Sequence, residues 1–583
     1  MVHVNKTKEI ECMTGIPSVR IKDDISIVIC GEAGQGIQSM EYVLTHVLKR
    51  AGYHVFGTKE YMSRIRGGSN STEIRISSKR VAAFVNRIDL LLPLDNDAIP
   101  HLKHRITNST TIIGEREKLN TSYDVIDVPF SQIAREVGRA IYANTVAVGV
   151  VLGLLKVEPE VLDGYLKEYF TDKSQDIVDD NIKAGRKGFE IGECLSGSGK
   201  IDIQLQRHPE VKEELLINGA DAISLGAIAG GCNFISAYPM SPSTGVFTFL
   251  AQHARDFDLI AEQAEDEISA INMAIGAWYA GGRALVSTAG GGYALMTEGF
   301  SLAGMLESPL VFHLAQRPAP ATGLPTRTEQ GDLLFALYGG HGEFPRAIFA
   351  PGTIEEAFSL TQQAFNLADR SQCQIFVLTD QYLIDSFYNV PDFDRSGIGI
   401  EKHFIKTDAD YRRYRITESG VSPRGIPGHG EGLVVLDSDE HDEEGHITED
   451  MEVRTQMVDK RLRKQELLRQ AAIPPKLVGD RDYRTLVVAW GSNYHVVKEA
   501  LETIDKEGVA FLHFSQVHPL HVDAKKHLQK AAQTIVLENN ATGQFATLLK
   551  TQTGIEADEK ILKYNGMPFH VEELVDRFNS LIN

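Results

Sequence analysis

Residues Phe234–Thr244 read FISAYPMSPST, and this stretch decides the fold class. The apolar run Phe234–Ala237 has the length and composition of a buried strand, and a helical pattern begins near Val246. Two prolines stiffen the turn between them, and Ser243 or Thr244 is able to cap the helix. Open α/β sheets bind ligands at the carboxyl ends of parallel strands. The stretch therefore predicts a parallel α/β sheet with either a ligand turn or a plain capped helix start at this position.

The same alternation of β-branched runs and helical patterns recurs along the chain, which predicts three α/β domains with mainly parallel sheets. Residues 195–200 read LSGSGK and predict a flexible linker. The expected organisation is a Rossmann-like domain over 1–194, a linker over 195–214, a second α/β domain over 215–400, an irregular charged segment over 401–475 and a small α/β domain over 476–583.

Charge and cysteine content exclude several classes of protein. The formal net charge of −20 argues against a nucleic-acid-binding protein and against docking on anionic membranes. The five cysteines are scattered and form no CxxC pair, so the chain does not supply the ligands of a ferredoxin-type cluster. No apolar run approaches the ~20 residues that span a bilayer. We expect a cytoplasmic protein.

A glycine-rich turn follows the first strand, where Gly31, Gly34 and Gly36 separate a β-branched run from a helical pattern. Backbone N–H groups at such a turn favour a phosphate, although the spacing is GxxGxG and not the dinucleotide fingerprint. A plain strand-to-helix turn explains it equally well. Downstream, Arg64 and Arg66 are candidates to hold a phosphorylated ligand or to form salt bridges.

The acid that stands out in the centre of the chain is Glu267. At 100° per residue, one apolar stripe is formed by Ala264, Ile268, Ile271 and Ile275. Glu267 lies about 60° from the centre of that stripe, closer than Glu265 or Asp266. A carboxyl group there has a raised proton affinity unless it meets a specific partner. The alternative is an ordinary acid that suits the helix dipole.

Two further segments are typical of a ligand site. Residues 287–293 run from a strand into Gly290, Gly291 and Gly292, which permits close approach of a flat ligand or a second subunit. Residues 316–332 form a long loop rich in proline and glycine, and loops of this length inside a domain are usually functional. Arg317 and Arg327 in this loop are natural partners for a substrate carboxylate.

These motifs together resemble the 2-oxoacid:ferredoxin oxidoreductases. YPMSPST resembles the YPITPS motif of that family, and the acidic helix at 265–277, STAGGG and TGLPTRTEQGDL follow in the family's order. GEAGQGIQ and RIRGGS resemble its gamma domain, residues 215–400 its thiamine-diphosphate pyrimidine-binding, transketolase-like domain, and residues from 476 onward its transketolase C-terminal-like domain. The chain is similar to a fused gamma–alpha subunit, an arrangement that favours 2-oxoglutarate as the substrate.

The resemblance also implies roles for individual residues. Glu267 matches the glutamate that hydrogen-bonds N1′ of the aminopyrimidine of thiamine diphosphate and so activates the cofactor. Ser241 takes the place of a threonine near the substrate. Further substrate contacts are implied for Tyr238, Pro239, Thr326, Arg327 (our first choice for the carboxylate) and Arg317 (our second). Cofactor contacts are implied for Ser243, Thr244, Gly290, Gly291 and Gly292, and a coenzyme A or phosphate site for Gly31, Gly34, Gly36, Arg64 and Arg66.

Two expected features of such an enzyme are missing from the sequence: a GDG…N motif for Mg²⁺ and cysteines for [4Fe-4S] clusters. The family carries both on a beta subunit, so the resemblance implies an αβ or (αβ)₂ assembly that is inactive without that partner. The implied reaction is oxidation of a 2-oxoacid to acyl-CoA and CO₂ with ferredoxin as acceptor, or the reverse carboxylation of the reductive TCA cycle. The alternatives are a non-redox thiamine enzyme and a nucleotide- or CoA-binding regulatory protein.

Two charged segments favour simple interpretations. Residues 437–446 offer carboxylates and imidazoles, for which a solvated acidic loop is the simpler reading and a metal site the alternative. Lys460–Lys464 reads as a solvated helix face, with a dock for an acidic partner such as ferredoxin as the alternative.

Overall fold

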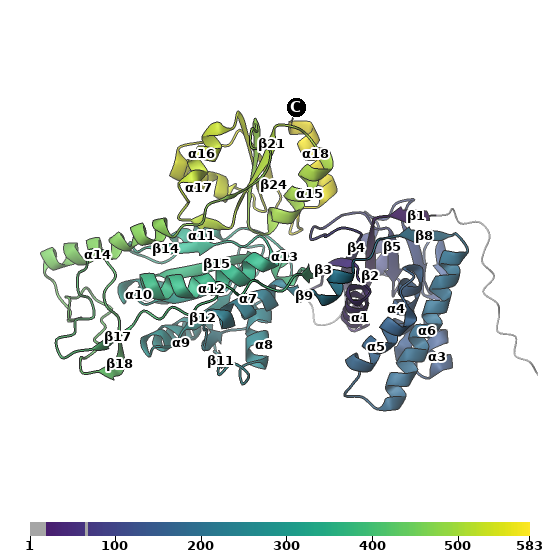
Figure 1. Cartoon of the computed structure of the whole chain (residues 1–583), viewed down its shortest axis with the longest axis horizontal. Helices are drawn as coiled ribbons and strands as arrows, with labels where there is room; N and C mark the ends of the chain where they lie inside the picture. The colour runs from purple at the N-terminus through teal and green to yellow at the C-terminus, as the bar shows by residue number, and fades with distance from the viewer. Residues whose placement is uncertain (1–18, 64–67, 583) are drawn as a thin grey trace, which may run out of the picture. The chain divides into compact units, whose positions relative to one another are not determined.

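A computed structural model describes residues 19–63 and 68–582. The described chain divides into two compact units, one formed by the residues up to Leu216 together with Phe387–Asp392, the other by Ile217–Ser386 and Phe393 onward. Figure 1 shows the elements of both units. Among the described residues, no helix is long and apolar enough to cross a membrane.

An eight-stranded sheet forms the centre of the first unit, in the order β7-β6-β5-β2-β4-β3-β16-β9. β2 pairs in parallel with β5 but antiparallel with β4, and β3 and β16 continue antiparallel, so the sheet is mixed. Its strands are β2 (Asp24–Glu32), β3 (His54–Glu60), β4 (Ser69–Ser77), β5 (Leu90–Pro93), β6 (Thr111–Gly114), β7 (Val125–Asp127), β9 (Leu215–Asn218) and β16 (Phe387–Val390). Its helices are α1 (Ile37–Arg50), α2 (Ala98–Leu102), α3 (Phe130–Val137), α4 (Ala143–Leu154), α5 (Pro159–Tyr169) and α6 (Gln175–Gly197).

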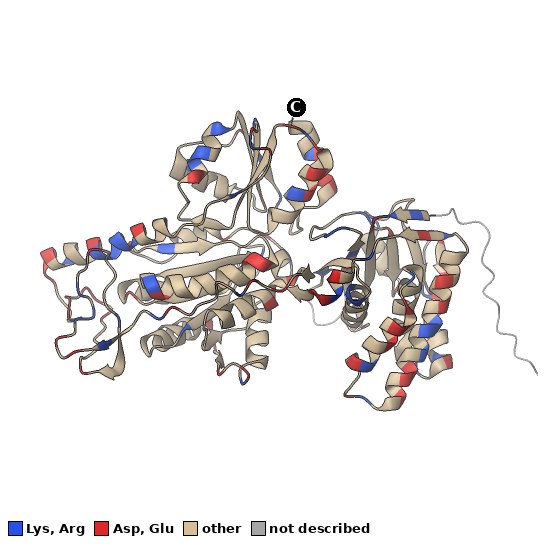
Figure 2. Ribbon diagram, viewed as in Figure 1, with Lys and Arg blue, Asp and Glu red and all other residues tan. Residues whose placement is uncertain are grey.

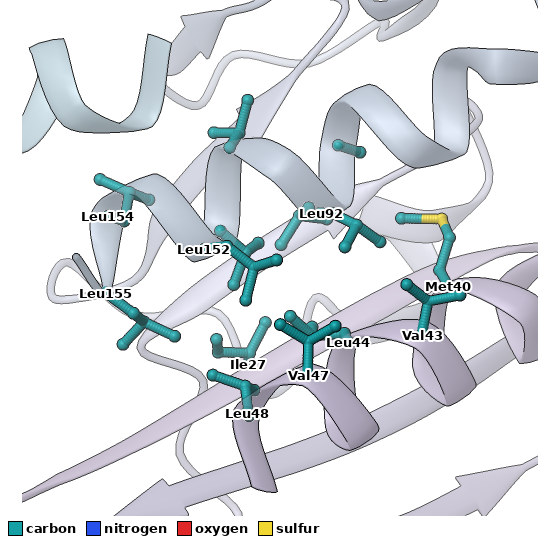
Figure 3. Packing of buried hydrophobic residues seen from close by; sticks show 14 of the residues in the cluster. Ile27, Met40, Val43, Leu44, Val47, Leu48, Leu92, Leu152, Leu154 and Leu155 are labelled. Atoms are coloured by element: carbon teal, nitrogen blue, oxygen red, sulfur yellow. The ribbon is translucent and has the colours of Figure 1, made fainter. Parts of the chain in front are cut away.

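The core of this unit lies between the sheet and helices α1 and α4. Leu44 and Val47 of α1 lie near Leu152 of α4 and Ile27 of β2 in a fully buried cluster (Figure 3). α4 is apolar on all sides because α6 covers the face that the sheet does not. The two helices approach closely, since a Cβ on Gly188 would lie 2.0 Å from the carbonyl oxygen of Val146. Only glycine fits at that position without moving a backbone.

The second unit contains a seven-stranded sheet in the order β11-β10-β12-β13-β15-β14-β22. All neighbours are parallel except β22, which is antiparallel to β14. The strands are β10 (Phe234–Ala237), β11 (Ile260–Gln263), β12 (Ala284–Thr288), β13 (Leu310–Gln316), β14 (Arg346–Phe349), β15 (Gln374–Asp380) and β22 (Gln516–His518). The accompanying helices are α7 (Gly219–Ala229), α8 (Thr244–Gln252), α9 (Glu267–Tyr279), α10 (Gly290–Met305), α11 (Leu333–Tyr338), α12 (Ile354–Ser371) and α13 (Gln381–Asp385).

A five-stranded sheet near the carboxyl terminus belongs to the same unit, in the order β19-β21-β20-β23-β24. Helices α15 and α18 lie on one side of it and α16 and α17 on the other (Figure 1). Its elements are β19 (Lys476–Gly479), β20 (Thr485–Trp490), β21 (Val509–Phe514), β23 (Gln533–Glu538), β24 (Glu559–Leu562), α15 (Tyr494–Ile504), α16 (Asp523–Lys530), α17 (Gln544–Thr553) and α18 (Val571–Leu581). We refer to residues 476–582 as the C-terminal sheet region.

The predicted α/β class with mainly parallel sheets is confirmed, but two local expectations differ from the structure. The segment expected as a flexible linker contains the end of α6 and strand β8 (Ile201–Gln204), which pairs in parallel with β1 (Val19–Lys22). Its glycines lie at a helix end, where Gly199 has a positive φ of 73°, so they terminate α6 and reverse the chain. Residues 401–475 also hold regular structure: β17 (Ile405–Thr407), β18 (Gly425–Gly430) and the long helix α14 (Met451–Gln470).

The reading of Lys460–Lys464 as a solvated face is wrong. Acidic and basic residues both occur along the whole of α14 (Figure 2), yet Lys460 and Lys464 are fully buried. The Lys460 ammonium lies 2.5 Å from a carboxylate oxygen of Glu307, and Lys464 pairs with the other oxygen. Burial alone would raise the pKa of Glu307, but the two ammonium groups hold it well below its usual range. A helix with charges on every side gives no hydrophobic period by which to find such a face.

The segment 437–446 is likewise tied to α14, because Glu440 bonds Arg461 through both carboxylate oxygens and also pairs with Arg454. Within the described ranges, no group of three or more His, Cys, Asp or Glu side chains is placed to hold a metal ion.

We expect Glu307→Gln to destabilise the second unit strongly, because it leaves two buried ammonium groups without a counter-charge. Breaking a buried ion pair from one side costs roughly 3–5 kcal/mol. Denaturant unfolding of the full chain measures this, with Glu298→Gln on the exposed face of α10 as the control. Burial lowers the pKa of Lys460 to about 8 even with Glu307 beside it, and loss of this carboxylate lowers it further, so the deficit in unfolding free energy should shrink as the pH rises toward 8. Equal unfolding midpoints for the two variants would contradict the role of this cluster.

Candidate active site

Glu267 is the first residue of α9, directly after the loop that follows β11. The side chain of Asp266 caps the helix by accepting a hydrogen bond from the Ser269 backbone N–H at 2.7 Å. Because Asp266 serves the cap, Glu267 is not needed for it and turns inward, where it is only 3% exposed. Glu265 is exposed, so the prediction that Glu267 is the acid nearest the buried side is confirmed.

The apolar stripe expected for this helix is partly wrong. Ala264 precedes α9, and Ile268 is 48% exposed. The buried face is instead made by Glu267, Ala270, Ile271, Ala274, Ile275 and Trp278. The helix starts at Glu267, and its buried face therefore includes Glu267 itself and not Ile268.

The carboxyl group of Glu267 is buried without satisfying its hydrogen-bonding capacity. Its Oε1 atom has no hydrogen-bond partner among the described residues. Burial raises the pKa of Glu267, and the neighbouring Asp266 carboxylate adds to the rise. An unpaired buried polar atom costs about 1–3 kcal/mol and usually marks a site completed by another molecule.

The three glycines at the start of α10 have three different surroundings. A Cβ on Gly292 would lie 2.7 Å from Oε1 of Glu267, so the carboxyl group packs directly on this backbone. A Cβ on Gly290 would lie 2.4 Å from Oδ2 of Asp332. A Cβ on Gly291 would meet nothing closer than 3.9 Å, so that position borders open space. The first turn of α10 is therefore flanked by two carboxyl groups and open between them.

Asp332 is a site residue that the sequence reasoning missed. It is 6% exposed, and its Oδ2 atom has no hydrogen-bond partner within the part of the chain that is described. Burial raises the pKa of Asp332 to about 6, the Glu329 carboxylate adds to the rise, and the Arg317 guanidinium opposes it. The only signal in the sequence is an acid just before the helical pattern at 333–338, which is also what an ordinary helix cap looks like.

The turn after β10 lies beside this helix end. Arg317 donates a hydrogen bond of 2.6 Å from Nη1 to the carbonyl oxygen of Ser241, and the Met240 sulfur is 4.0 Å from the Gly291 Cβ position. The Ser243 hydroxyl donates to the Met240 carbonyl at 2.7 Å, so the expected capping of α8 by its side chain is wrong. Thr244 is the first residue of α8. Tyr238 and Pro239 are exposed on the turn.

The two candidate arginines lie in different surroundings. Arg317 is 9% exposed and is near Ser241 and Asp332. Arg327 is half-buried against the C-terminal sheet region, where its Nη1 lies 3.7 Å from the Met567 sulfur. Thr326 beside it is buried. The structure thus brings Glu267, Asp332, Arg317, Ser241 and the glycines around one helix end, and places Arg327 at the far side of the same loop.

The glycine turn of the first unit lines a cavity of its own, of about 290 Å³. Gly34 and Gly36 border it together with the amino-terminal end of α1 and Lys59. Gly36 has a positive φ of 82°, and the Asn144 side chain fixes the turn by donating to the Gln35 carbonyl at 2.8 Å. Glu32 and Glu60 also line the cavity. Arg64 and Arg66 lie outside the described residues.

Two protein-family models match the parts of the chain that contain these sites. Residues 225–460 match the family model "Pyruvate flavodoxin/ferredoxin oxidoreductase, thiamine diP-bdg", and residues 26–191 match "Pyruvate ferredoxin/flavodoxin oxidoreductase". The alpha subunit of a 2-oxoacid:ferredoxin oxidoreductase from a Sulfolobus species is 30% identical, over 96% of this chain and 97% of that protein. The chain belongs to the alpha subunits of the 2-oxoacid:ferredoxin oxidoreductases.

Two further relatives of this alpha subunit carry a substrate in their names. The 2-oxoglutarate oxidoreductase subunit KorA of Mycobacterium tuberculosis is 26% identical, over 95% of this chain and 90% of that protein. The structure of 2-oxoglutarate:ferredoxin oxidoreductase from Magnetococcus marinus, with 2-oxoglutarate, coenzyme A and succinyl-CoA bound, superposes with a TM-score of 0.90. It is 29% identical and covers 96% of this chain and all of that one. The thiamine-binding family segment contains every residue around the amino-terminal end of α10.

We expect Asp332→Asn to stabilise the alpha subunit at high pH. The folded-state pKa of about 6 lies above the ordinary value of 3.8, so the wild-type chain loses stability as the pH rises through that window. Asparagine has the same shape and no charge to desolvate, so the thermal midpoint of the variant should exceed that of the wild type by a few degrees at about pH 8 and match it near pH 4.

The control is Asp482→Asn, since the Asp482 side chain is 98% exposed. If the thermal midpoints of Asp332→Asn and the wild type differ by the same amount at pH 4 and pH 8, ionisation of the Asp332 carboxyl is not the source of the effect.

Proposed function

We propose that this alpha subunit contributes Glu267 to a thiamine diphosphate site completed by a beta subunit, and that the assembled enzyme converts a 2-oxoacid to acyl-CoA and CO₂ with ferredoxin as acceptor, or runs the reverse carboxylation. The observation that carries the proposal is the buried Oε1 of Glu267, which has no partner in the described chain. Thiamine diphosphate, when bound, supplies the nucleophilic carbon and the electron sink for the substrate carbonyl.

The residues at the amino-terminal end of α10 fit the aminopyrimidine of that cofactor. Burial raises the pKa of Glu267, and its Oε1 has no hydrogen-bond partner in the described chain, so this oxygen is available to hydrogen-bond a ring nitrogen. Gly292 gives the carboxyl group room beside the helix, and the open position at Gly291 leaves space for a flat ring. This chain would hold the aminopyrimidine end of thiamine diphosphate, and the hydrogen bond from Glu267 to the ring nitrogen would activate the cofactor.

The surroundings of the site support a partner that covers it. Exposed apolar side chains lie on the elements next to Glu267: Ile268 on α9, Leu295 on α10 and Leu324 on the loop between β13 and α11. Burial of these side chains under a second subunit would remove apolar surface from water, which favours association. A beta subunit on this face would also bring the Mg²⁺ and [4Fe-4S] groups that the sequence of this chain does not provide for, in an αβ or (αβ)₂ assembly.

For the substrate, we propose 2-oxoglutarate, which two of the relatives carry in their names. A dicarboxylic substrate needs cationic partners at two positions, and the loop 316–332 offers both Arg317 and Arg327. Ser241, Tyr238, Pro239 and Thr326 complete the candidate substrate contacts. For coenzyme A, which is bound in the Magnetococcus enzyme, we propose the first unit's cavity at Gly34 and Gly36, with Gly31 behind the turn and Arg64 and Arg66 as candidates outside the described residues.

The decisive test uses the complex of this chain with its beta subunit and follows reduction of ferredoxin by 2-oxoglutarate and coenzyme A. Glu267→Gln should lower kcat by roughly 100- to 10,000-fold, the range for loss of a positioned acid–base group. The matched control is Glu265→Gln on the same turn, whose side chain is exposed and whose loss should leave the rate unchanged.

A second measurement separates catalysis from folding. Burial raises the pKa of Glu267 because it disfavours the ionised carboxylate. Glutamine carries no charge to desolvate, so Glu267→Gln should unfold at a temperature no lower than the wild type. Full activity of the Glu267→Gln complex would exclude the proposed role. Product formation without any electron acceptor would favour a non-redox thiamine enzyme, and a chain that only binds coenzyme A would favour a regulatory protein.

A further inference from the structure

The C-terminal sheet region binds the loop between β13 and α11 at Gln330. This loop carries Arg317, Thr326, Arg327 and Asp332. We propose that Gln330 is a positioning residue through which the C-terminal sheet region sets the geometry of this loop and thereby the binding of the 2-oxoacid. The inference rests on the proposed function of the site at α10. Gln330 contacts neither Glu267 nor the open space at Gly291 in any described interaction, so it would act only through the loop.

Gln330 is fully buried, and every polar group of the residue is used. Its side-chain Oε1 accepts hydrogen bonds from the Asn539 backbone N–H at 3.1 Å and the Asn493 Nδ2 at 2.9 Å. Its Nε2 donates to the Trp490 carbonyl at 3.1 Å. Its backbone N–H donates to the Asn539 carbonyl at 2.7 Å, and its own carbonyl accepts from the Asn540 Nδ2 at 3.1 Å. A satisfied buried network of this kind fixes one position.

The partners of Gln330 come from one edge of the C-terminal sheet. Trp490 ends β20 and Asn539 directly follows β23, and these two strands are parallel neighbours. The carboxyl edge of such strands is where open α/β sheets usually bind a ligand. Here that edge holds a side chain of the same chain. Residues of WGSN (490–493) and ENNATGQ (538–544) therefore bind the loop between β13 and α11 by hydrogen bonds to Gln330.

The residues that bond Gln330 are themselves held in place by Glu538. The carboxylate of Glu538, which is fully buried, accepts hydrogen bonds from the backbone N–H groups of Phe545 and Ala546 at the start of α17 and from the Asn540 side chain. Asn540 is thereby aimed at the Gln330 carbonyl. Its Oδ1 also accepts the Gly543 N–H at 2.8 Å. The groups that bond Gln330 are thus fixed by hydrogen bonds within the C-terminal sheet region itself.

The loop is tied down on both sides of Gln330. The Gln544 Nε2 donates to the Gly331 carbonyl at 2.7 Å, and the Thr328 N–H donates to the Gly566 carbonyl at 3.1 Å. Asp332, which packs on Gly290, is only two residues from Gln330, and Arg327 is three residues away on the other side. Two residues span at most about 7 Å and three at most about 11 Å, so a displacement at Gln330 is passed on to both neighbours.

The experiment compares Gln330→Ala with Gln374→Ala in the full αβ complex. Gln374 is also fully buried in the second unit, where its Nε2 bonds only the Ser308 carbonyl, and its loss controls for general destabilisation. We expect Gln330→Ala to raise the KM for 2-oxoglutarate by on the order of 10- to 100-fold, as misplacement by about 1 Å does, with an unchanged KM for ferredoxin. Gln374→Ala should leave both unchanged.

Two further measurements keep the inference falsifiable if Gln330→Ala folds poorly. Asn493→Ala removes the partner of the same bond and should raise the same KM, and the double variant should be no worse than the stronger single one, since the residues act through one contact. Amide hydrogen exchange of the full alpha chain alone should speed up over 317–332 in Gln330→Ala but not in Gln374→Ala.

The outcomes separate the two proposals. A wild-type complex that does not reduce ferredoxin with 2-oxoglutarate removes the proposed function, whatever Gln330 does to exchange in the loop. An active wild-type complex in which Gln330→Ala and Gln374→Ala shift the KM equally, or in which exchange over 317–332 stays slow, removes the positioning role alone.

Discussion

A carboxyl group that is taken out of water needs a partner, and Glu267 has none for its Oε1 within the described chain. Burial and the neighbouring Asp266 carboxylate raise the pKa of Glu267, so ionising this group inside the fold costs free energy. Several features of the second unit follow from this constraint. Asp266 takes over the helix cap so that Glu267 points inward, and position 292 must be glycine because any Cβ there would meet the carboxyl group. The open space beside Gly291 lies on the same turn of α10 as Gly292, on which the Glu267 carboxyl group packs.

The elements of the second unit were largely predictable from sequence because parallel strands are apolar along their whole length. Phe234–Ala237 is a strand with the predicted bounds, and the helix after it begins at Thr244, two residues before the predicted start near Val246. The first unit was less so. Its antiparallel strand β16 comes from a distant part of the chain, and no local pattern tells that Phe387–Val390 pairs with β3 after an intervening sheet.

The site was predictable where position along a helix decides burial, and hidden where the tertiary structure decides it. Helical phase separated Glu267 from Glu265 and Asp266. It could not find Asp332, because an acid before an apolar helix looks like a cap until Gly290 is seen against it. Nor could helical phase find the burial of Lys460 and Lys464. Their counter-charge is Glu307, just after the end of α10, which lies 153 and 157 positions away in the chain.

Glu307 and Gln330 show how the second unit is held together with little help from hydrophobic pattern. Glu307 joins the end of α10 to α14 by charge, and Gln330 joins the loop after β13 to the C-terminal sheet by amide hydrogen bonds. Both are fully buried, so both contacts are costly to break and direct the elements to one geometry. α10 has the carboxyl pair at its first turn and Glu307 just beyond its last. The helix is therefore fixed at the end that faces away from the site, while at the other end Oε1 of Glu267 and Oδ2 of Asp332 have no hydrogen-bond partner in the described chain, which leaves them for another molecule to complete.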